Sequence, residues 1–377
     1  MPDLLEQRLT ARLADLRSAG LGRDIPPISA REGLRYRLNG RPVVSFCSND
    51  YLGLASASWS GELTSAALGA GASRLVCGEF PEHHHLERRL AELAGSEDAV
   101  LFPSAFQLNL GALPALIAAD DRVFSDRLNH ASLIDGLRLA EPRPQILPHL
   151  ASPPASSQPT WWVTESTFSM DGDGPAPADL RAHLHGGGLL YLDEAHSFAL
   201  YPGAASLSRH LGIRPTVLVG ALGKAIGCAG AVLAASAIVC RWIRARCRSF
   251  VFSTGLAPIL ARAIEHQLDR ACGDEGDARR DRLWRNIAHL TARLGLTRPT
   301  PTPIFPILVR DNHRALAISA ELQERGWHIQ AIRPPTVPEG TARLRLTVSA
   351  AHEADDIDAM ADDLLTLLRR HGHQLGA

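Results

Sequence analysis

The sequence predicts an α/β protein with a mainly parallel central sheet and a smaller α+β domain near its C-terminal end. From about residue 98 to residue 296, short apolar runs alternate with segments of helical period. Strands that alternate with helices favour a parallel sheet covered on both faces. After a Pro- and Thr-rich stretch at residues 297–303, the alternation starts again with shorter elements. A length of 377 residues exceeds what one hydrophobic core usually organises, so more than one domain is expected.

The N-terminal segment, residues 1–40, is expected to be helical. Its leucines are spaced so that they share one face of a helix over residues 3–19, and a stretch containing Gly and Pro at residues 20–27 ends that helix. The segment contains acidic residues and lacks the apolar core of a signal peptide.

A large domain is expected over residues 41–296. Six of its apolar runs are typical of buried strands: residues 99–102, 122–125, 161–165, 188–194, 216–222 and 230–235. Helices are expected at residues 131–140 and 179–185, followed by two longer, Arg-rich helices near residues 256–271 and 277–294.

A smaller α+β domain is expected over residues 297–377. Its predicted strands lie at residues 307–309, 328–332 and 343–348. A helix over residues 313–325 separates the first two strands, and a last helix begins at Glu353.

Composition and charge exclude several classes of protein. With 45% hydrophobic and 21% charged residues, the chain is typical of a soluble globular protein. A net charge of −1 and a pI near 7.0 give no general attraction to nucleic acid or to an anionic membrane. No apolar run is long enough to span a bilayer, and the six cysteines form no C-x-x-C pair. We therefore expect a cytoplasmic protein with reduced thiols and without a metal, nucleic-acid or membrane partner.

Polar residues that could carry chemistry follow the expected strands at their carboxyl ends, where ligands collect in open parallel sheets. Asp193 ends one strand, Lys224 follows the next, and Glu165 and Ser169 follow a third. Lys224 is the only charged residue in the stretch 215–240. A buried ammonium is costly unless it is paired or gives up its proton, so this lysine needs an explanation.

Pyridoxal phosphate chemistry explains a lone lysine at a strand end. Desolvation lowers the pKa of a lysine ammonium in general and yields a nucleophilic amine that can form a Schiff base. The cofactor also needs a carboxylate for its pyridine nitrogen, which Asp193 could supply. The stretch 104–109 opens a helix after a strand and could hold a phosphate through backbone N–H groups. The alternative is a lysine whose amine reaches solvent and an aspartate that caps a helix.

Other motifs fail on the identity of single residues. A Walker A loop would need glycine at Leu218 and a hydroxyl residue at Ala225, and an S-x-x-K motif would need serine at Ala221. The three histidines at 83–85 are explained better by the surface of a helix rich in Glu and Arg than by a metal site.

Six segments occur in an order that resembles the α-oxoamine synthases, which are pyridoxal-phosphate enzymes of the aspartate aminotransferase-like fold, fold type I. They are SNDYLGL (48–54), DRLNHASLIDG (126–136), TESTFSMDGD (164–173), DEAH (193–196), GALGKAIG (220–227) and FSTGLAP (252–258). Two more, EGDARRDRL (275–283) and AIRPPTVPEGTARLRLTVSAAHE (331–353), are most similar to the members that condense L-alanine with a pimeloyl thioester. The resemblance covers nearly the whole chain and implies a large domain of the seven-stranded type.

This resemblance implies a role for each matching residue. Lys224 binds the cofactor covalently, Asp193 pairs with its pyridine nitrogen, and His130 stacks on its ring and contacts substrate, so these three are the expected catalytic residues. The further cofactor contacts are His196 at the ring hydroxyl, Ser169 beside the ring, the backbone N–H groups of Ala105 and Phe106 at the phosphate, and Ser253 and Thr254 at the phosphate across a dimer interface. The expected substrate contacts are Arg23, Asn49, His130, Thr336 and Arg345, with the Arg345 guanidinium as the clamp on the amino-acid carboxylate.

The resemblance also implies a homodimer with shared active sites and a thioester carried by coenzyme A or by an acyl carrier protein. One alternative is another α-oxoamine synthase that joins glycine or serine to a different acyl-CoA. A second is a non-catalytic dimer with a degenerate pocket, because Ala105 and Ala221 stand where the family has a glycine and a hydroxyl residue. The segment 55–72 and the loop near 148–160 are shorter than is usual in the family.

Overall fold

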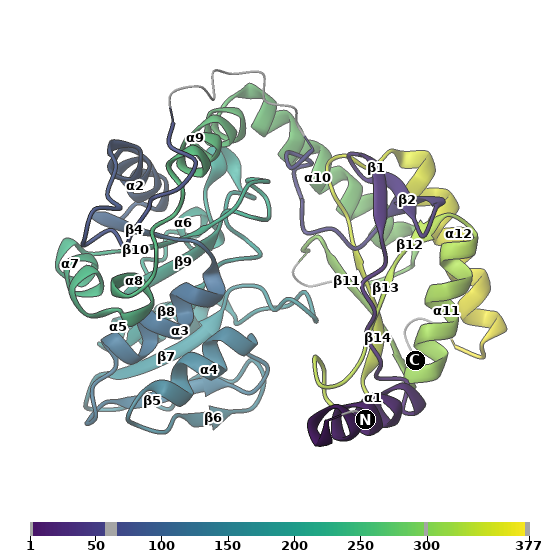
Figure 1. Cartoon of the computed structure of the whole chain (residues 1–377), viewed down its shortest axis with the longest axis horizontal. Coiled ribbons are helices and arrows are strands. Elements are labelled where there is room, and N and C mark those ends of the chain that lie inside the picture. The colour runs from purple at the N-terminus through teal and green to yellow at the C-terminus, as the bar shows by residue number, and fades with distance from the viewer. Residues whose placement is uncertain (1–2, 57–65, 298–300, 374–377) are drawn as a thin grey trace. The chain divides into compact units, whose positions relative to one another are not determined.

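The computed structural model describes residues 3–56, 66–297 and 301–373. Contacts divide the chain into two units (Figure 1). The larger unit comprises Asn49–Ser169 and Asp173–Arg282, and the smaller unit comprises Met1–Ser48, Met170–Gly172 and Leu283–Ala377. Residues 57–65, within the segment 55–72, lie outside the described part of the chain.

The larger unit is built on a seven-stranded sheet with the strand order β4-β10-β9-β8-β7-β5-β6. The strands are β4 (Asp98–Phe102), β5 (Arg122–Asp126), β6 (Gln145–Leu147), β7 (Thr160–Glu165), β8 (Leu189–Asp193), β9 (Val217–Ala221) and β10 (Ala231–Ala235). Strands β9, β8, β7, β5 and β6 pair in parallel, whereas β10 is antiparallel to both of its neighbours. The predicted, mainly parallel sheet is therefore confirmed, including all six strands that the apolar runs indicated.

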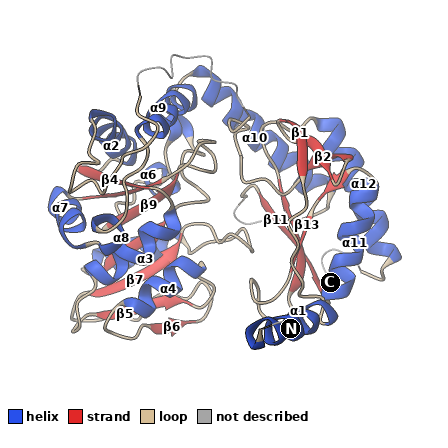
Figure 2. Ribbon diagram, in the orientation of Figure 1, coloured by secondary structure: helices blue, strands red, loops and turns tan. Residues whose placement is uncertain are grey.

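Helices cover both faces of this sheet (Figure 2). They are α2 (Pro81–Ala94), α3 (Ala105–Leu116), α4 (Ala131–Leu139), α5 (Pro177–His185), α6 (Leu207–His210), α7 (Ala237–Arg246), α8 (Arg248–Val251) and α9 (Pro258–Cys272), with a short 3₁₀ turn at Pro202–Ala204. Along β7, Trp161 and Val163 pack with α3, α4 and α7 on one face, while Trp162 packs with α5 on the other. Burial on both faces explains why these strands are apolar along their whole length.

The described residues of the smaller unit form two sheets and three helices of its own. A four-stranded sheet joins β1 (Ile28–Glu32), β2 (Arg35–Leu38), β3 (Arg41–Ser45) and β12 (Trp327–His328), and a three-stranded sheet joins β11 (Ile304–Arg310), β14 (Ala342–Thr347) and β13 (Gln330–Ile332). The helices are α1 (Leu4–Ser18), α11 (Asn312–Glu324) and α12 (Ala354–Arg370), and α10 (Asp274–Arg293) spans the boundary between the units.

The structure divides the chain at other residues than the three predicted segments, 1–40, 41–296 and 297–377. One reason is the parallel pairing of β3, which the prediction placed at the start of the large domain, with β12 of the C-terminal segment. The segment 1–40 is also only partly helical, because α1 is followed by the antiparallel strands β1 and β2.

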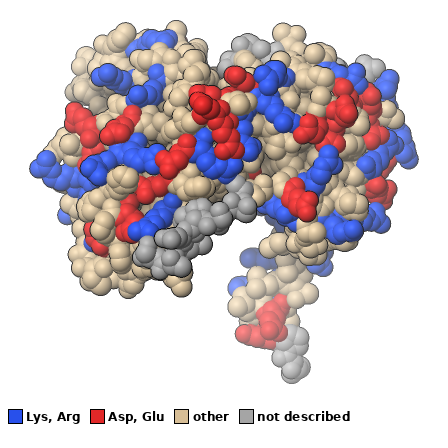
Figure 3. All heavy atoms as spheres, turned by 90° about the horizontal axis from the view of Figure 1, so that it is seen from above, with Lys and Arg blue, Asp and Glu red and all other residues tan. Residues whose placement is uncertain are grey.

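Two surface properties agree with the composition. Among the described helices, none is long and apolar enough to cross a membrane. On the face drawn in Figure 3, acidic and basic side chains are interspersed rather than separated into patches of one sign.

Candidate active site

Three neighbouring strands of the larger unit end at the candidate site. Glu165 is the last residue of β7, and Asp193 is the last residue of β8. The two residues lie opposite each other in the register of these parallel strands. Lys224 lies in the turn that follows β9, where it is half-buried. The turn is closed by hydrogen bonds such as that from the Gly227 N–H to the Lys224 carbonyl at 2.9 Å. Gly227 has φ +69°, and a Cβ at this position would lie 2.5 Å from the backbone nitrogen of Ala55, so the turn requires glycine here.

Lys224 is the only lysine among the 377 residues, since all other basic side chains of the Lys and Arg class are arginines. An amine that binds an aldehyde cofactor through a side-chain Schiff base therefore has a single candidate in this chain. The motif-based prediction of Lys224 did not use this count, which is a stronger signal than the surrounding apolar stretch.

The carboxylate of Asp193 is buried and held at both oxygens. The Ala195 N–H donates to Oδ1 at 2.9 Å, and the Asn109 amide Nδ2 donates to Oδ2 at 2.8 Å. Asp193 as a whole is only 4% exposed. A buried carboxylate fixed in this way can accept a charge-assisted hydrogen bond from a protonated ring nitrogen.

His130 begins α4 and caps it. Its Nδ1 accepts hydrogen bonds from the Ser132 N–H at 3.2 Å and lies 2.8 Å from Ser132 Oγ. The backbone N–H of His130 donates to Oε1 of Glu165 at 2.6 Å. The imidazole ring contacts the Phe106 ring edge to face, at a centroid distance of 6.3 Å. The ring is partly exposed, so it can face a ligand while its backbone is fixed.

The pKa values of Glu165 and His130, two titratable neighbours of Asp193, shift in opposite directions. Burial raises the pKa of Glu165 well above its usual range, and the Asp193 charge raises it further. Partial burial and the nearby Lys224 ammonium lower the pKa of His130, against the opposing charge of Asp193. The site thus favours a protonated Glu165 and a neutral His130.

The first turn of α3 offers backbone donors for an anion. Ser104 caps the helix by accepting from the Gln107 N–H at 3.2 Å, and Ala105 and Phe106 are the first two helical residues. The N–H groups in the first turn of a helix have no acceptor within the helix and commonly bind phosphate. Together with Lys224 and Asp193, this donor set fits pyridoxal phosphate, which needs an amine, a carboxylate and a phosphate site.

His196 and Asn49 are linked by a residue that was quoted in the motif SNDYLGL but not assigned to the site. The buried hydroxyl of Tyr51 lies 2.7 Å from Nδ1 of His196 and donates to Oδ1 of Asn49 at 3.2 Å. Two of the predicted positions, Asn49 and His196, are thereby joined through the tyrosine hydroxyl. Tyr51 was missed because its role depends on a contact with a residue 145 positions away.

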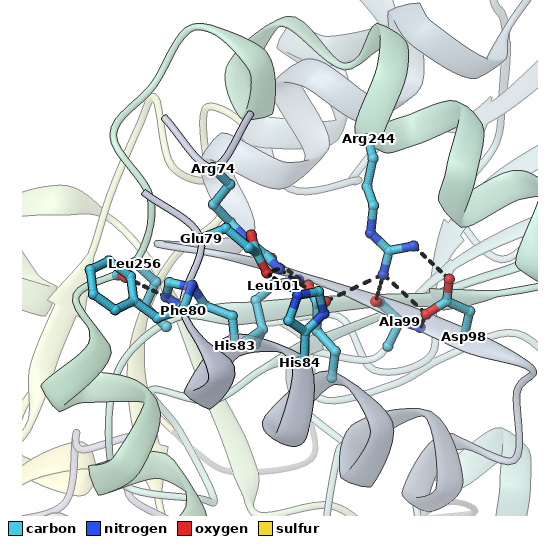
Figure 4. Close-up of polar contacts among 11 residues, drawn as sticks. Arg74, Glu79, Phe80, His83, His84, Asp98, Ala99, Leu101, Arg244 and Leu256 are labelled. Atoms are coloured by element: carbon cyan, nitrogen blue, oxygen red, sulfur yellow. Dashed lines mark hydrogen bonds and ion pairs between the residues drawn. The ribbon is translucent and has the colours of Figure 1, made fainter. Parts of the chain in front are cut away.

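Ser253 and Thr254 lie on a segment that is tied to the first turn of α2 and to the loop before it. His83 Nε2 donates to the Leu256 carbonyl at 2.7 Å (Figure 4). The Gly255 N–H donates to the Ala72 carbonyl at 3.0 Å. The Phe80 N–H donates to His83 Nδ1 at 3.2 Å, so both nitrogens of the His83 imidazole make hydrogen bonds.

The loop before α2 is itself held by an ion-pair cluster in which Arg74 and Glu87 are buried and the other members are partly exposed, also drawn in Figure 4. Arg74 bonds to the carboxylates of Glu79 and Glu87, and Arg244 joins Glu87 to Asp98, to which it donates at 2.6 Å. The expected helix surface at 83–85 is correct for His84 and His85, which are exposed, and wrong for His83, which is completely buried. No group of three metal-binding side chains occurs among the residues that the structure describes.

The remaining predicted substrate residues belong to the smaller unit. Arg23 Nη2 donates to Thr336 Oγ1 at 2.9 Å, so the structure brings these two residues together from opposite ends of the chain. Arg345 lies on β14 and is 5% exposed. Ser169, a predicted cofactor contact, belongs instead to the larger unit, where it is the last residue of the segment Asn49–Ser169 and is half-buried.

Comparisons with known proteins place this geometry in a family context. A family model described as aminotransferase class I and II matches residues 41–364. The 8-amino-7-oxononanoate synthase of Herminiimonas arsenicoxydans is 39% identical to the chain, over 95% of the chain and 98% of its own length. The protein of the same name from Aromatoleum aromaticum is 38% identical, over 96% of the chain and 98% of its own length.

Solved structures share the fold. A serine palmitoyltransferase from S. paucimobilis matches with a TM-score of 0.86 at 21% identity, over 98% of this chain and all (100%) of its own. An 8-amino-7-oxononanoate synthase from Francisella tularensis matches with a TM-score of 0.73 at 24% identity, over 88% and 99% of the two chains. The predicted aminotransferase-like fold is therefore confirmed.

Proposed function

We propose a specific reaction for this chain, which belongs to the family of 8-amino-7-oxononanoate synthases: the condensation of L-alanine with a pimeloyl thioester, with release of CO2 and free thiol. The chain is an acyltransferase of the α-oxoamine synthase class, its cofactor is pyridoxal phosphate, and its family acts in biotin biosynthesis. The observation that supports the reaction most is the position of the only lysine, Lys224, beside the strand that ends in the buried carboxylate of Asp193.

The proposed roles follow from the atoms on each side chain. When bound, the cofactor supplies an electron sink for the carbanion at Cα of the amino acid. The Asp193 carboxylate holds the proton on the pyridine nitrogen, and the Lys224 amine takes the proton from substrate Cα as general base. His130 stacks on the ring and donates to the substrate carbonyl, His196 bonds the ring hydroxyl, and Ser169 lies beside the ring. The N–H groups of Ala105 and Phe106 bind the phosphate.

We propose the substrate contacts that the family resemblance implies. We assign the amino-acid carboxylate to Arg345, because a guanidinium fork suits a carboxylate. Arg23, Asn49 and Thr336 are the further substrate contacts, and the hydrogen bond between Arg23 and Thr336 supports treating those two as one group. The thiol carrier is coenzyme A or an acyl carrier protein, and the enzyme is expected to act in the cytoplasm.

A screen with product mass spectrometry tests the reaction. The holoenzyme is incubated with L-alanine, glycine or L-serine, each combined with pimeloyl-CoA, a pimeloyl carrier protein or palmitoyl-CoA. We expect a product only from L-alanine with a pimeloyl thioester, together with release of CO2, and none from Lys224→Ala. A product from glycine or serine with another acyl-CoA would replace the proposal with a different α-oxoamine synthase. No product together with no bound cofactor would indicate a non-catalytic dimer.

The proposed homodimer shares its active sites through Ser253 and Thr254. Thr254 is exposed in the single chain, and its neighbour Phe252 is 73% exposed, which leaves an apolar side chain for a second copy to cover. Mixing Lys224→Ala chains with Thr254→Ala chains gives heterodimers with one doubly defective site and one intact site. Recovery of activity on mixing supports sharing, and its absence from proven heterodimers contradicts it.

A further inference from the structure

Asn109 on α3 is completely buried and uses both ends of its amide. Nδ2 donates to Oδ2 of Asp193 at 2.8 Å and to Oγ of Ser132 at 2.9 Å. Oδ1 accepts from the hydroxyl of Tyr191, which is also completely buried, at 2.7 Å. A carboxylate accepts hydrogen bonds only, so Nδ2 must face Asp193, and this orientation leaves Oδ1 as the acceptor for Tyr191.

The second donor of Asn109 sets the direction of the next hydrogen bond. Because Ser132 Oγ accepts from Asn109, its own hydroxyl proton can be given to Nδ1 of His130, 2.8 Å away. The Ser132 N–H donates to the same Nδ1 at 3.2 Å. A ring nitrogen that accepts from two donors is unprotonated, so the single proton of the neutral His130 ring lies on Nε2.

The surroundings of His130 agree with a neutral ring. The ring caps the N-terminus of α4, where the helix dipole disfavours a cation. The charged and titratable groups that face it are Lys224, which disfavours a second positive charge, Asp193, which favours one, and the buried Glu165 behind its backbone. The net direction is a lowered pKa for His130, with burial as the main cause.

We propose that Asn109 is a positioning residue that orients the Asp193 carboxylate and, through Ser132, holds His130 as the tautomer protonated on Nε2. One buried amide thereby sets both the residue that serves the pyridine nitrogen and the residue that faces the substrate. His130 acts as a neutral hydrogen-bond donor to a substrate oxygen rather than as an imidazolium acid. This inference rests on the roles of Asp193 and His130 in the proposed function.

Three variants separate the hydrogen bond from Asn109 to Asp193 from the link through Ser132 to His130. Asn109→Leu removes both donors while keeping four side-chain heavy atoms branched at Cγ. Ser132→Ala removes only the link to His130, and Tyr191→Phe removes only the donor that orients the amide. Asp193→Ala reports on the proposed role of Asp193 itself. For each holoenzyme we would measure the dissociation constant of pyridoxal phosphate by equilibrium dialysis. The tautomer and protonation midpoint of His130 come from ¹⁵N-histidine NMR, with the signal assigned by its loss in His130→Asn.

We expect Asn109→Leu to weaken cofactor binding about ten- to a hundredfold, as for the loss of a hydrogen bond to a charged group. Ser132→Ala should leave that constant unchanged but raise the proton affinity of His130 about fivefold, since a donor to the neutral ring is lost. Tyr191→Phe should weaken cofactor binding about fivefold, and this variant serves if Asn109→Leu does not fold.

The outcomes distinguish the inference from the proposed function. If Asp193→Ala binds the cofactor as tightly as the unaltered protein, the proposed role of Asp193 fails. If Asp193→Ala weakens binding but neither Asn109→Leu nor Tyr191→Phe does, Asn109 does not position the carboxylate. If His130 in the unaltered holoenzyme is protonated on Nδ1 at neutral pH, the assignment of the tautomer is wrong.

Discussion

The backbone N–H of His130 donates a hydrogen bond to Oε1 of Glu165 at 2.6 Å. This bond ties the residue that begins α4 to the last residue of β7, and it places a buried acid behind the candidate catalytic histidine. Because burial and Asp193 raise the pKa of Glu165 above its ordinary value of 4.5, the acid binds its proton more tightly in the folded chain than in the unfolded one.

Replacing Glu165 by glutamine should therefore make the protein more stable relative to the unaltered protein, and this difference should grow as pH rises. An acid whose pKa is raised by folding makes the folded state less stable as pH increases from the unfolded pKa to the folded pKa. Glu165→Gln keeps an oxygen acceptor for the His130 N–H but loses this titration. Melting temperatures at about pH 5 and about pH 8 should show a difference, variant minus unaltered protein, that becomes more positive at the higher pH. A constant difference would contradict the raised pKa.

His149 should stabilise the larger unit in a pH-dependent way. Its Nδ1 lies 3.0 Å from Asp126 and its Nε2 lies 3.1 Å from Asp173. Burial lowers the pKa of His149, but the two carboxylates outweigh it and raise the value from 6.5 to about 9. A histidine with a raised pKa stabilises the fold fully below the unfolded pKa and loses that effect as pH rises through the folded pKa.

His149→Gln should thus lower the melting temperature strongly near pH 7 and much less near about pH 10. His289→Gln is the matched control, since His289 pairs with Asp358 at 2.8 Å on the surface, where both side chains are about 40% exposed. Equal losses at both pH values for His149→Gln would mean that the charge on the imidazole does not contribute.

Arg74 should be one of the costliest arginines to remove. Its side chain is only 4% exposed, and its loss leaves the buried carboxylate of Glu87 with less compensation. Breaking a buried ion pair by removing one partner costs about 3–5 kcal/mol. Arg138→Ala is the control, because Arg138 is 68% exposed in its pair with Asp135 and such surface pairs contribute about 0–1 kcal/mol. Chemical denaturation measures both, and similar losses would show that the cluster is not a stabilising one.

Ala221→Thr should slow the loss of cofactor. Ala221 is the last residue of β9 and is 7% exposed, and the family resemblance places a hydroxyl at this position on the phosphate. A hydrogen bond to a charged group contributes about 1.5–3 kcal/mol, or roughly ten- to a hundredfold in affinity. We expect slower dissociation on dialysis with little change in kcat, with Ala221→Val as the control of similar shape. An identical rate for Thr and Val would show that the phosphate is bound in another way.

Arg345→Ala should raise the KM for alanine far more than the KM for the acyl substrate. A carboxylate left without its partner in a buried site loses about 2–5 kcal/mol of binding. Arg345→Lys keeps the charge but not the planar fork, so an intermediate effect is expected. Steady-state kinetics with each substrate varied in turn measures the split, and equal effects on both constants would remove Arg345 from the carboxylate site.

The sequence predicted the sheet of the larger unit because its strands are buried on both faces and are therefore apolar throughout. It did not predict β1 to β3, because β1 is exposed along its whole length, β2 alternates over only four residues, and β3 is exposed in its first two residues and buried in its last three. It predicted a helix surface at residues 83–85 but neither the bounds of α2 nor its buried face, which includes His83, Leu86 and Leu90.

The candidate site divides in the same way. Glu165, Asp193 and Lys224 were predictable, since strand ends can be located from the apolar runs alone. Asn109, Tyr51 and Tyr191 were not, because each acts through a hydrogen bond to a residue at least 82 positions away. Such contacts depend on how strands and helices are brought together in the fold, which neither periodicity nor spacing reports.

The position of Lys224 has a consequence for the chemical vulnerability of the protein. Because the chain has one ε-amine and that amine lies in the turn after β9, lysine-directed electrophiles have no other lysine side chain to consume them. The proposed role of Lys224 makes every acylated or carbamylated lysine an inactivated site, so the extent of modification and the loss of turnover should be equal. A cofactor that occupies the amine protects the protein at the same position, which links resistance to such reagents directly to cofactor supply.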